Sequence, residues 1–162
     1  MNSVRKIIVT FFLFIVAVAS SQKVWAWDAT DFIIYEPVEW DDVCSYVMLG
    51  DVEKILTDNG FHVETEGKVY DEMRQEYCRT LVYRKSDVER AVVFFHPEYE
   101  EQPMMVDITF PDEELCMAFC RNAILKMNWS GDGVYFIDGF VESGVLLEIK
   151  GNMVSVIDNG PM

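Results

Sequence analysis

The segment with the most metal-ligand character is Asn128-Trp129-Ser130-Gly131-Asp132-Gly133, which places oxygen-bearing side chains at alternate positions and a glycine sixth. This spacing is typical of the start of a calcium-binding loop, in which side-chain oxygens surround the ion. Such a loop needs a glutamate at its twelfth position, where this chain has Gly139, and the residues after Gly133 have a strand pattern. We therefore interpret the segment as a turn, and we expect no metal site and no cofactor.

Catalytic chemistry has little support in the sequence. The two histidines, His62 and His96, lie near no serine or cysteine motif, and no G-x-S-x-G sequence or phosphate-binding glycine loop occurs. A hydrolase that uses two carboxylates remains an alternative. With 28 acidic residues in the chain, however, acidic pairs occur everywhere and no particular pair supports it. We expect the protein not to be an enzyme.

The four cysteines, Cys44, Cys78, Cys116 and Cys120, are candidates for disulfide bonds. Four cysteines in a small exported chain most often form two bridges, and three pairings exist. Cys116 and Cys120 lie one turn apart on an expected helix, where a direct bridge is strained. We expect each of them to reach outward, to Cys44 and Cys78. Buried free thiols or a single bridge are the alternatives.

The first 26 residues have the plan of a secretory signal peptide. Two basic residues, Arg5 and Lys6, precede an apolar run of residues 7–19 that is short for a membrane-spanning helix. The small-residue rule allows cleavage after Ala26, which we favour, or after Ala19. An uncleaved membrane anchor is the alternative. The sequence thus predicts an exported protein, periplasmic or extracellular, with one acidic domain over residues 27–162.

The charge of the chain restricts its partners. The formal net charge is −15; without residues 1–26, ten basic side chains face 28 acidic ones, a formal charge of −18. Such a surface repels nucleic-acid phosphates and anionic membranes, so we expect no nucleic acid and no membrane insertion after processing. It attracts a basic protein partner, although a merely soluble surface has the same composition.

Two groups of residues are candidates for binding. Glu98, Tyr99, Glu100 and Glu101 lie in an expected loop between two strands, where an aromatic side chain within an acidic rim favours a protein interface; a solvated loop is the alternative. The aromatic N-terminal region, with Trp27 and Trp40, favours a small-ligand or carbohydrate site. The same aromatic residues would equally serve as the apolar side of an edge strand packed on a sheet.

The elements that must position these residues follow from hydrophobic periodicity. Residues 32–35 are expected to be a short strand or an extended lead-in. A helix is expected from Asp41 or Asp42 through Leu49; it breaks or restarts at Gly50-Asp51 and ends at Asp58-Asn59-Gly60-Phe61. Strands follow over residues 62–70, 79–84, 90–96 and 104–110, and residues 70–77 have a pattern compatible with a short helix.

A second helix opens at Pro111-Asp112-Glu113-Glu114, and its apolar face includes Leu115, Phe119, Ala123 and Met127. Strands follow over 134–138, 145–150 and 153–158, with a hairpin at Gly151-Asn152. The sequence therefore predicts an α+β fold: an antiparallel sheet of about six to seven strands in two meanders, with two main helices on one face. The segments 40–44 and 112–116 resemble each other, which would fit a duplicated helix-plus-meander unit with both helices on one face of the sheet. Because the match is only five residues of common types, we ascribe it to chance.

These observations lead to one hypothesis and one alternative. The hypothesis is an exported, non-enzymatic binding protein that acts as an inhibitor or immunity protein by neutralising a basic protein. The alternative is a module that binds a small ligand or carbohydrate through the N-terminal aromatic cluster.

Overall fold

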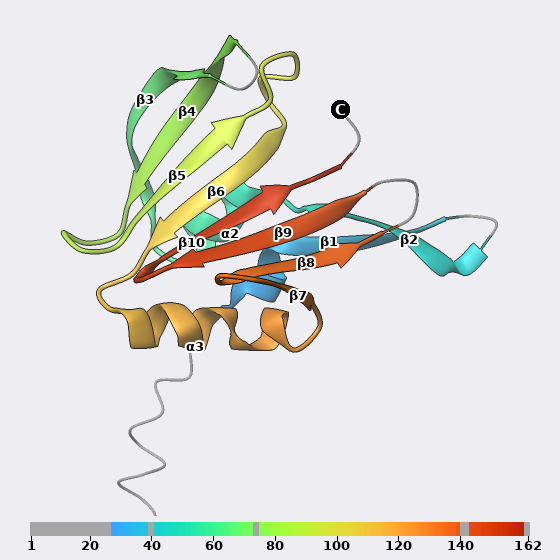
Figure 1. Ribbon diagram of the computed structural model, residues 1–162. Coiled ribbons are helices and arrows are strands. Elements are labelled where there is room, and N and C mark those ends of the chain that lie inside the picture. The colour runs from blue at the N-terminus through green and yellow to red at the C-terminus, as the bar shows by residue number, and fades with distance from the viewer. Residues whose placement is uncertain (1–26, 39–40, 73–74, 140–142, 161–162) are drawn as a thin grey trace, which may run out of the picture.

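An eight-stranded antiparallel sheet is the main element of the fold, and a two-stranded hairpin lies beside it (Figure 1). The computed structural model describes residues 27–38, 41–72, 75–139 and 143–160, without the side chains of residues 37, 38 and 41–45. Along the chain the elements are η1 (Ala29–Phe32), β1 (Ile33–Val38), β2 (Asp41–Leu49), α2 (Val52–Asp58), β3 (His62–Asp71), β4 (Glu76–Arg84), β5 (Arg90–Phe95), β6 (Pro103–Thr109), α3 (Glu113–Ile124), β7 (Asn128–Gly131), β8 (Val134–Asp138), β9 (Gly144–Lys150) and β10 (Met153–Asp158).

The large sheet consists of two halves with the same order of elements. Its strands follow the order β3-β4-β5-β6-β10-β9-β8-β7, so a helix followed by a four-stranded meander occurs twice, and the last strands of the two meanders, β6 and β10, pair at the centre. Both helices begin in the same way. The carboxylate of Asp51 accepts a hydrogen bond from Lys54 N at 3.0 Å, and that of Asp112 accepts one from Leu115 N at 2.8 Å.

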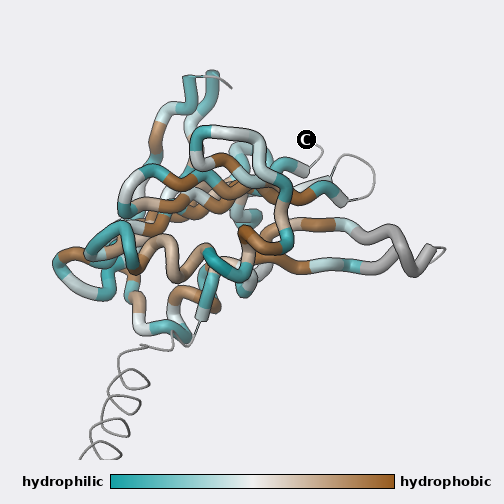
Figure 2. Tube along the Cα trace, turned by 60° about the horizontal axis from the view of Figure 1, so that its bottom comes forward, coloured by the Kyte–Doolittle hydropathy of each residue, from teal (hydrophilic) through white to brown (hydrophobic). Residues whose placement is uncertain are grey.

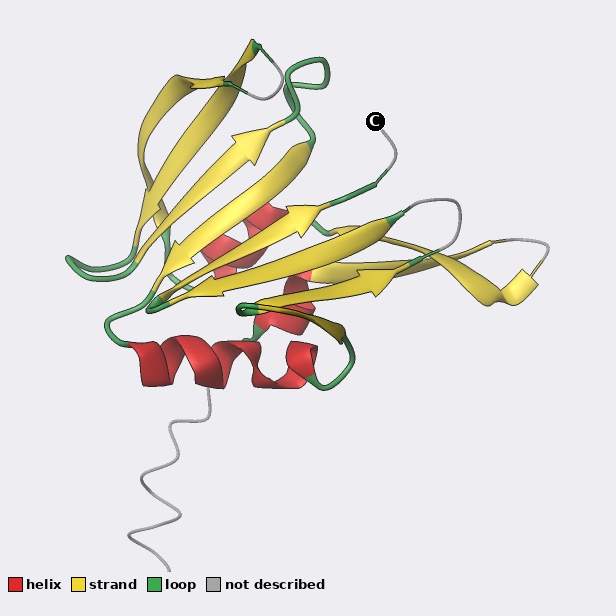
Figure 3. Ribbon diagram, in the orientation of Figure 1, coloured by secondary structure: helices red, strands yellow, loops and turns green. Residues whose placement is uncertain are grey.

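One face of the sheet carries the hydrophobic core. Side chains alternate across a strand, so the paired residues Tyr83, Ala91, Ile108 and Val154 share one face, and all four are buried. Core residues of η1, β2, α2 and α3 belong to the same cluster, which places these elements on that face (Figure 3). In Figure 2 the apolar segments gather in the interior of the molecule, and the outer loops are hydrophilic.

The expected α+β arrangement, with helices on an antiparallel sheet, agrees with the structure. The strand number differs, because the described residues form eight strands in the large sheet and two in the hairpin. One additional strand is β7, in the segment that the sequence marks as a turn; it forms a hairpin with β8 around Asp132 and Gly133. Among the described residues, no helix is long and apolar enough to cross a membrane.

The helix predicted from Asp41 or Asp42 through Leu49 is wrong: this segment is strand β2, paired with β1. The i, i+3, i+4 spacing of its apolar residues imitates a helix, but the same residues also alternate. Val47 and Leu49 are buried, whereas Tyr46 and Met48, which alternate with them, are half-buried. Pairing with β1 buries one side of this alternation, and such tertiary context outweighs a weak local pattern.

The predicted restart of a helix at Gly50-Asp51 and the predicted helix end are confirmed. The helix α2 begins after Asp51, and Gly60 adopts φ 85° while its N–H donates to Thr57 O and the N–H of Phe61 donates to Leu56 O. The short helix considered for residues 70–77 is not formed: Tyr70 and Tyr77 are paired residues at the end of the β3–β4 hairpin. The second helix is α3, with Asp112 as its N-cap and Pro111 just before it.

Candidate functional site

The loop between β5 and β6 holds the four residues predicted to bind a partner, Glu98, Tyr99, Glu100 and Glu101. Its backbone is closed by its own hydrogen bonds: His96 N donates to Gln102 O at 2.9 Å, and Gln102 N donates to Tyr99 O at 2.8 Å. All four side chains are exposed, Tyr99 by 60%. An aromatic ring that a closed loop holds in solvent is suited to contact a partner.

The end of the β3–β4 hairpin lies beside this loop and adds two exposed aromatic rings. Tyr70 and Tyr77 face each other across the hairpin with ring centroids 5.1 Å apart, and they are 43% and 65% exposed. Both strands continue beyond β5 here, because the β4–β5 pairing starts only at Thr80. Figure 1 shows the hairpin end and the β5–β6 loop next to each other at the top of the sheet.

Arg79 of β4 joins the hairpin to the loop. Its guanidinium lies 4.5 Å from the ring centroid of Phe95, and it donates to Glu66 Oε1 at 2.7 Å and to the main-chain oxygen of Glu100 at 3.1 Å. Lys68 adds an ion pair to Glu100, with Nζ 3.8 Å from Oε1. We call this surface, formed by Tyr70, Tyr77 and Glu98–Glu101, the acidic end; its two segments are fixed to each other.

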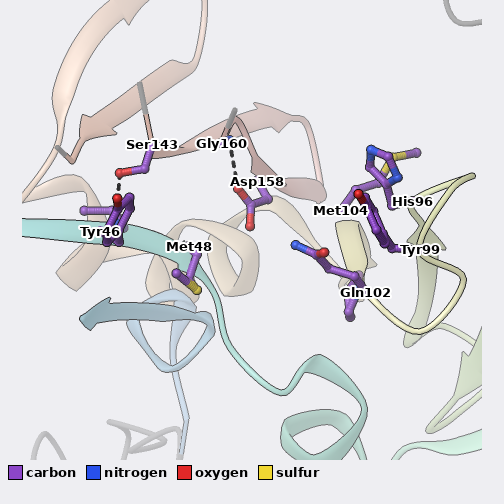
Figure 4. A pocket seen from close by; sticks show the side chains of 11 residues that line it. Tyr46, Met48, His96, Tyr99, Gln102, Met104, Ser143, Asp158 and Gly160 are labelled. Carbon is purple, nitrogen blue, oxygen red and sulfur yellow. Dashed lines mark hydrogen bonds between the residues drawn. The ribbon is translucent and has the colours of Figure 1, made fainter. Parts of the chain in front are cut away.

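A pocket of about 290 Å³ opens below the same loop, where the β1–β2 hairpin meets the ends of the sheet strands (Figure 4). This volume is at the lower end of the roughly 300–1,000 Å³ of small-molecule sites. The lining comes from four parts of the chain: Tyr46, Val47 and Met48 of β2; His96, Tyr99, Gln102, Pro103 and Met104 of the loop and β6; Ser143 before β9; and Asp158 and Gly160 at the end of β10.

Asp158 and Ser143 hold β2 against the sheet and so form the pocket. Asp158 Oδ2 accepts from Leu49 N at 3.2 Å while Oδ1 accepts from Gly160 N at 2.9 Å. Ser143 is buried, and its Oγ accepts from Val47 N at 3.3 Å. On the opposite wall, His96 Nδ1 accepts a hydrogen bond from Glu98 N at 3.2 Å. This bond links the pocket lining to the acidic end.

Of the two residues predicted for the carbohydrate alternative, the structure describes Trp27. Trp27 is 5% exposed, and its ring contacts those of Phe32, Phe61 and Phe119 at centroid distances of 5.7, 5.7 and 4.8 Å. No face of this ring is open for stacking on a sugar, so Trp27 is a core residue. Trp40 lies outside the described residues.

The expected disulfide from Cys116 or Cys120 to Cys78 is not formed. Cys78, Cys116 and Cys120 are buried, and no disulfide joins any two of them. Cys116 and Cys120 are hydrogen-bonded neighbours on α3 that face the core, whereas Cys78 lies on β4 near the acidic end. The hydrogen bond that Cys120 donates to Cys116, together with burial, raises the pKa of Cys120. The side chain of Cys44 lies outside those described.

The titratable groups do not gather into a metal site in the described part of the chain, where no three His, Cys, Asp or Glu side chains converge. His62 is exposed at the start of β3, while His96 lines the pocket. Outside the pocket and the acidic end, the carboxylate with a shifted pKa that stands out is Asp107 of β6. Burial raises its pKa, the side-chain hydrogen bond with Ser155 opposes that rise, and its Oδ1 has no hydrogen-bond partner among the described residues.

Sequence reasoning found the loop but missed the tyrosine pair and the pocket. The pair had a signal, because Tyr70 and Tyr77 lie symmetrically about a polar turn, which favours a hairpin. The pocket had no such signal, since Tyr46 and Asp158 line one pocket only because β2 is a strand. No protein-family model matches this chain, and no curated protein or solved structure matches it.

Proposed function

We propose that this protein is an exported binding protein without catalytic activity, which neutralises a basic protein in the manner of an inhibitor or immunity protein. The observation that carries the proposal is the acidic end. Three exposed tyrosines lie there beside the carboxylates of Glu98, Glu100 and Glu101. Tyrosine is enriched among the residues that dominate binding energy, and a rim of one charge gives specificity and fast association.

The rigidity of the acidic end supports the same proposal. Because Arg79 fixes the loop to the hairpin, the surface needs little ordering when a partner binds, and the entropic cost of association stays low. The net charge of −15 steers a cationic partner toward the molecule at low ionic strength. The burial of Trp27 takes away one of the two residues on which the carbohydrate alternative depends.

The proposal is tested by capture on the immobilised protein from a periplasmic or secreted fraction of the source organism. A basic protein should bind at low salt and dissociate at high salt, because exposed charges are screened beyond about 10 Å at 0.1 M ionic strength. The binding should be lost in the triple variant Glu98→Gln, Glu100→Gln, Glu101→Gln and weakened at least tenfold in Tyr77→Ala.

A second triple variant controls for total charge. Asp87→Asn, Glu114→Gln and Asp132→Asn remove the same three charges from exposed positions on the β4–β5 turn, α3 and the β7–β8 turn. This variant should retain the captured protein. If both triple variants lose it equally, net charge alone explains binding, and if no basic protein is captured at low salt, the proposed function is wrong.

A further inference from the structure

The pocket beneath the β5–β6 loop has the chemistry of a site for a cationic side chain. Its walls combine the methionines Met48 and Met104, the aromatic rings of Tyr46 and Tyr99, and a few polar side chains, and Asp158 supplies the carboxylate. None of its eleven lining residues is lysine or arginine. The carboxylate therefore lies in a largely apolar and aromatic pocket without a lysine or arginine in the lining, a setting in which an incoming positive charge is favoured.

The position of Asp158 is fixed before any ligand arrives. Each of its carboxylate oxygens accepts one main-chain N–H, from Leu49 and from Gly160. A carboxylate oxygen has two lone pairs, so each retains capacity for one further bond. Two parallel acceptor positions of this kind match the paired N–H groups of a guanidinium.

The surrounding side chains suit the rest of an arginine. In the view of Figure 4, Asp158 lies between Tyr46 on one side and Tyr99 on the other. Aromatic faces attract a guanidinium, and flexible methionines such as Met48 and Met104 pack against its methylene stem. Lysine would form neither the paired hydrogen bonds nor the flat stacking contact.

We propose that this pocket receives an arginine side chain. The inference rests on the proposed function, because the acidic end adjoins the pocket through Tyr99 and the arginine would belong to the basic partner that docks there. The partner's backbone would lie on the loop, and its arginine would extend past Tyr99 toward Asp158. The pocket thus anchors the partner while the acidic rim steers it.

The test uses a matched pair of small probes on the full chain. N-acetyl-arginine N-methylamide carries the arginine side chain on a neutral backbone, and its citrulline analogue has the same shape without the charge. With methionine methyl groups labelled for NMR, the arginine probe should shift the Met48 and Met104 signals with a dissociation constant on the order of millimolar, as befits a single side chain. The citrulline probe should bind at least tenfold more weakly.

Two variants and a control locate the site. Asp158→Asn should weaken the arginine probe at least tenfold, and Tyr99→Ala should weaken it severalfold without touching the hydrogen bonds of Asp158. The control Asp132→Asn makes the same chemical change in the exposed β7–β8 turn, at the other end of β8 from the pocket, and should leave binding within twofold. Unchanged backbone amide spectra show that each variant keeps the fold.

The outcomes separate this inference from the function on which it rests. Equal binding of both probes, or full binding by Asp158→Asn, overturns the arginine site even if a basic protein is captured through the acidic end. Selective binding of the arginine probe that Asp158→Asn abolishes supports the site. If no basic protein is then captured, the proposed function fails while the arginine pocket stands.

Discussion

Replacement of Trp27 by alanine should destabilise the protein by about 3–5 kcal/mol, as buried Trp or Phe to Ala changes do. The ring is buried and contacts three phenylalanine rings, of which Phe119 is nearest at a centroid distance of 4.8 Å. Burial of a large aromatic side chain removes about 150–250 Å² from water, worth roughly 4–6 kcal/mol at about 25 cal/mol per Å². This figure is an upper bound, since an unfolded chain already buries part of its apolar surface.

Replacement by phenylalanine should cost far less. The indole N–H of Trp27 is buried and has no hydrogen-bond partner among the described residues. An unpaired buried donor costs about 1–3 kcal/mol, and Trp27→Phe removes that cost while it loses only part of the ring. We expect the two effects to leave the free energy of unfolding within about 1 kcal/mol of the parent value.

Urea unfolding followed by far-ultraviolet circular dichroism measures both variants without relying on tryptophan emission. A loss of about 4 kcal/mol is a large part of the roughly 5–15 kcal/mol that stabilises a typical domain. The reasoning is refuted if Trp27→Ala lies within about 1 kcal/mol of the parent, because the ring is then not part of the core. If Trp27→Phe costs as much as Trp27→Ala, the unpaired N–H is not a source of instability.

Three further predictions concern groups outside the pocket. Asp107→Asn should raise the free energy of unfolding at pH 7. Burial raises the pKa of Asp107, so in urea titrations the parent should lose stability as pH rises from about 4 through the raised value, and the variant should lose less. Cys116 and Cys120 are buried and should react with iodoacetamide only after denaturation, as peptide mass spectrometry will show; rapid labelling of the native protein contradicts their burial. In chemical denaturation, Gly133→Ala should lower the free energy of unfolding by more than the roughly 1–2 kcal/mol expected of Gly60→Ala. Both glycines have positive φ, but only at Gly133 does an added Cβ come within 2.6 Å of a main-chain oxygen; equal costs contradict that close approach.

Much of the large sheet was predictable because its strands carry their own pattern. Strand β5 has the burial alternation expected of a half-buried strand, with Ala91, Val93 and Phe95 inward. The hairpin at Gly151 was predictable for a local reason, since a two-residue turn of this type needs positive φ, and Gly151 has φ 60°. These signals lie within a few residues of one another.

The errors occurred where distant partners decide the structure. Nothing local to Tyr46 and Val47 distinguishes a strand from a helix, and the choice is made by pairing with β1 and by the hydrogen bond from Val47 N to Ser143, 96 residues away. The pocket depends on the same choice, so it could not be predicted once β2 was misassigned. The acidic loop was predictable because charge density and turn residues are visible in sequence.

The pairing of β6 with β10 has a consequence for how the chain is divided. Five residue pairs, from Met153–Thr109 to Ile157–Met105, are the ladder that joins the two halves of the large sheet, and Pro111 lies between the halves in sequence. Each half is itself a continuous meander, built from contacts between sequence neighbours. The molecule therefore has the plan of a two-subunit assembly fused into one chain, with an internal interface where two subunits would meet edge to edge. A cut at Pro111 would turn that ladder into an intermolecular contact, and the two fragments would have complementary strand edges through which to rejoin.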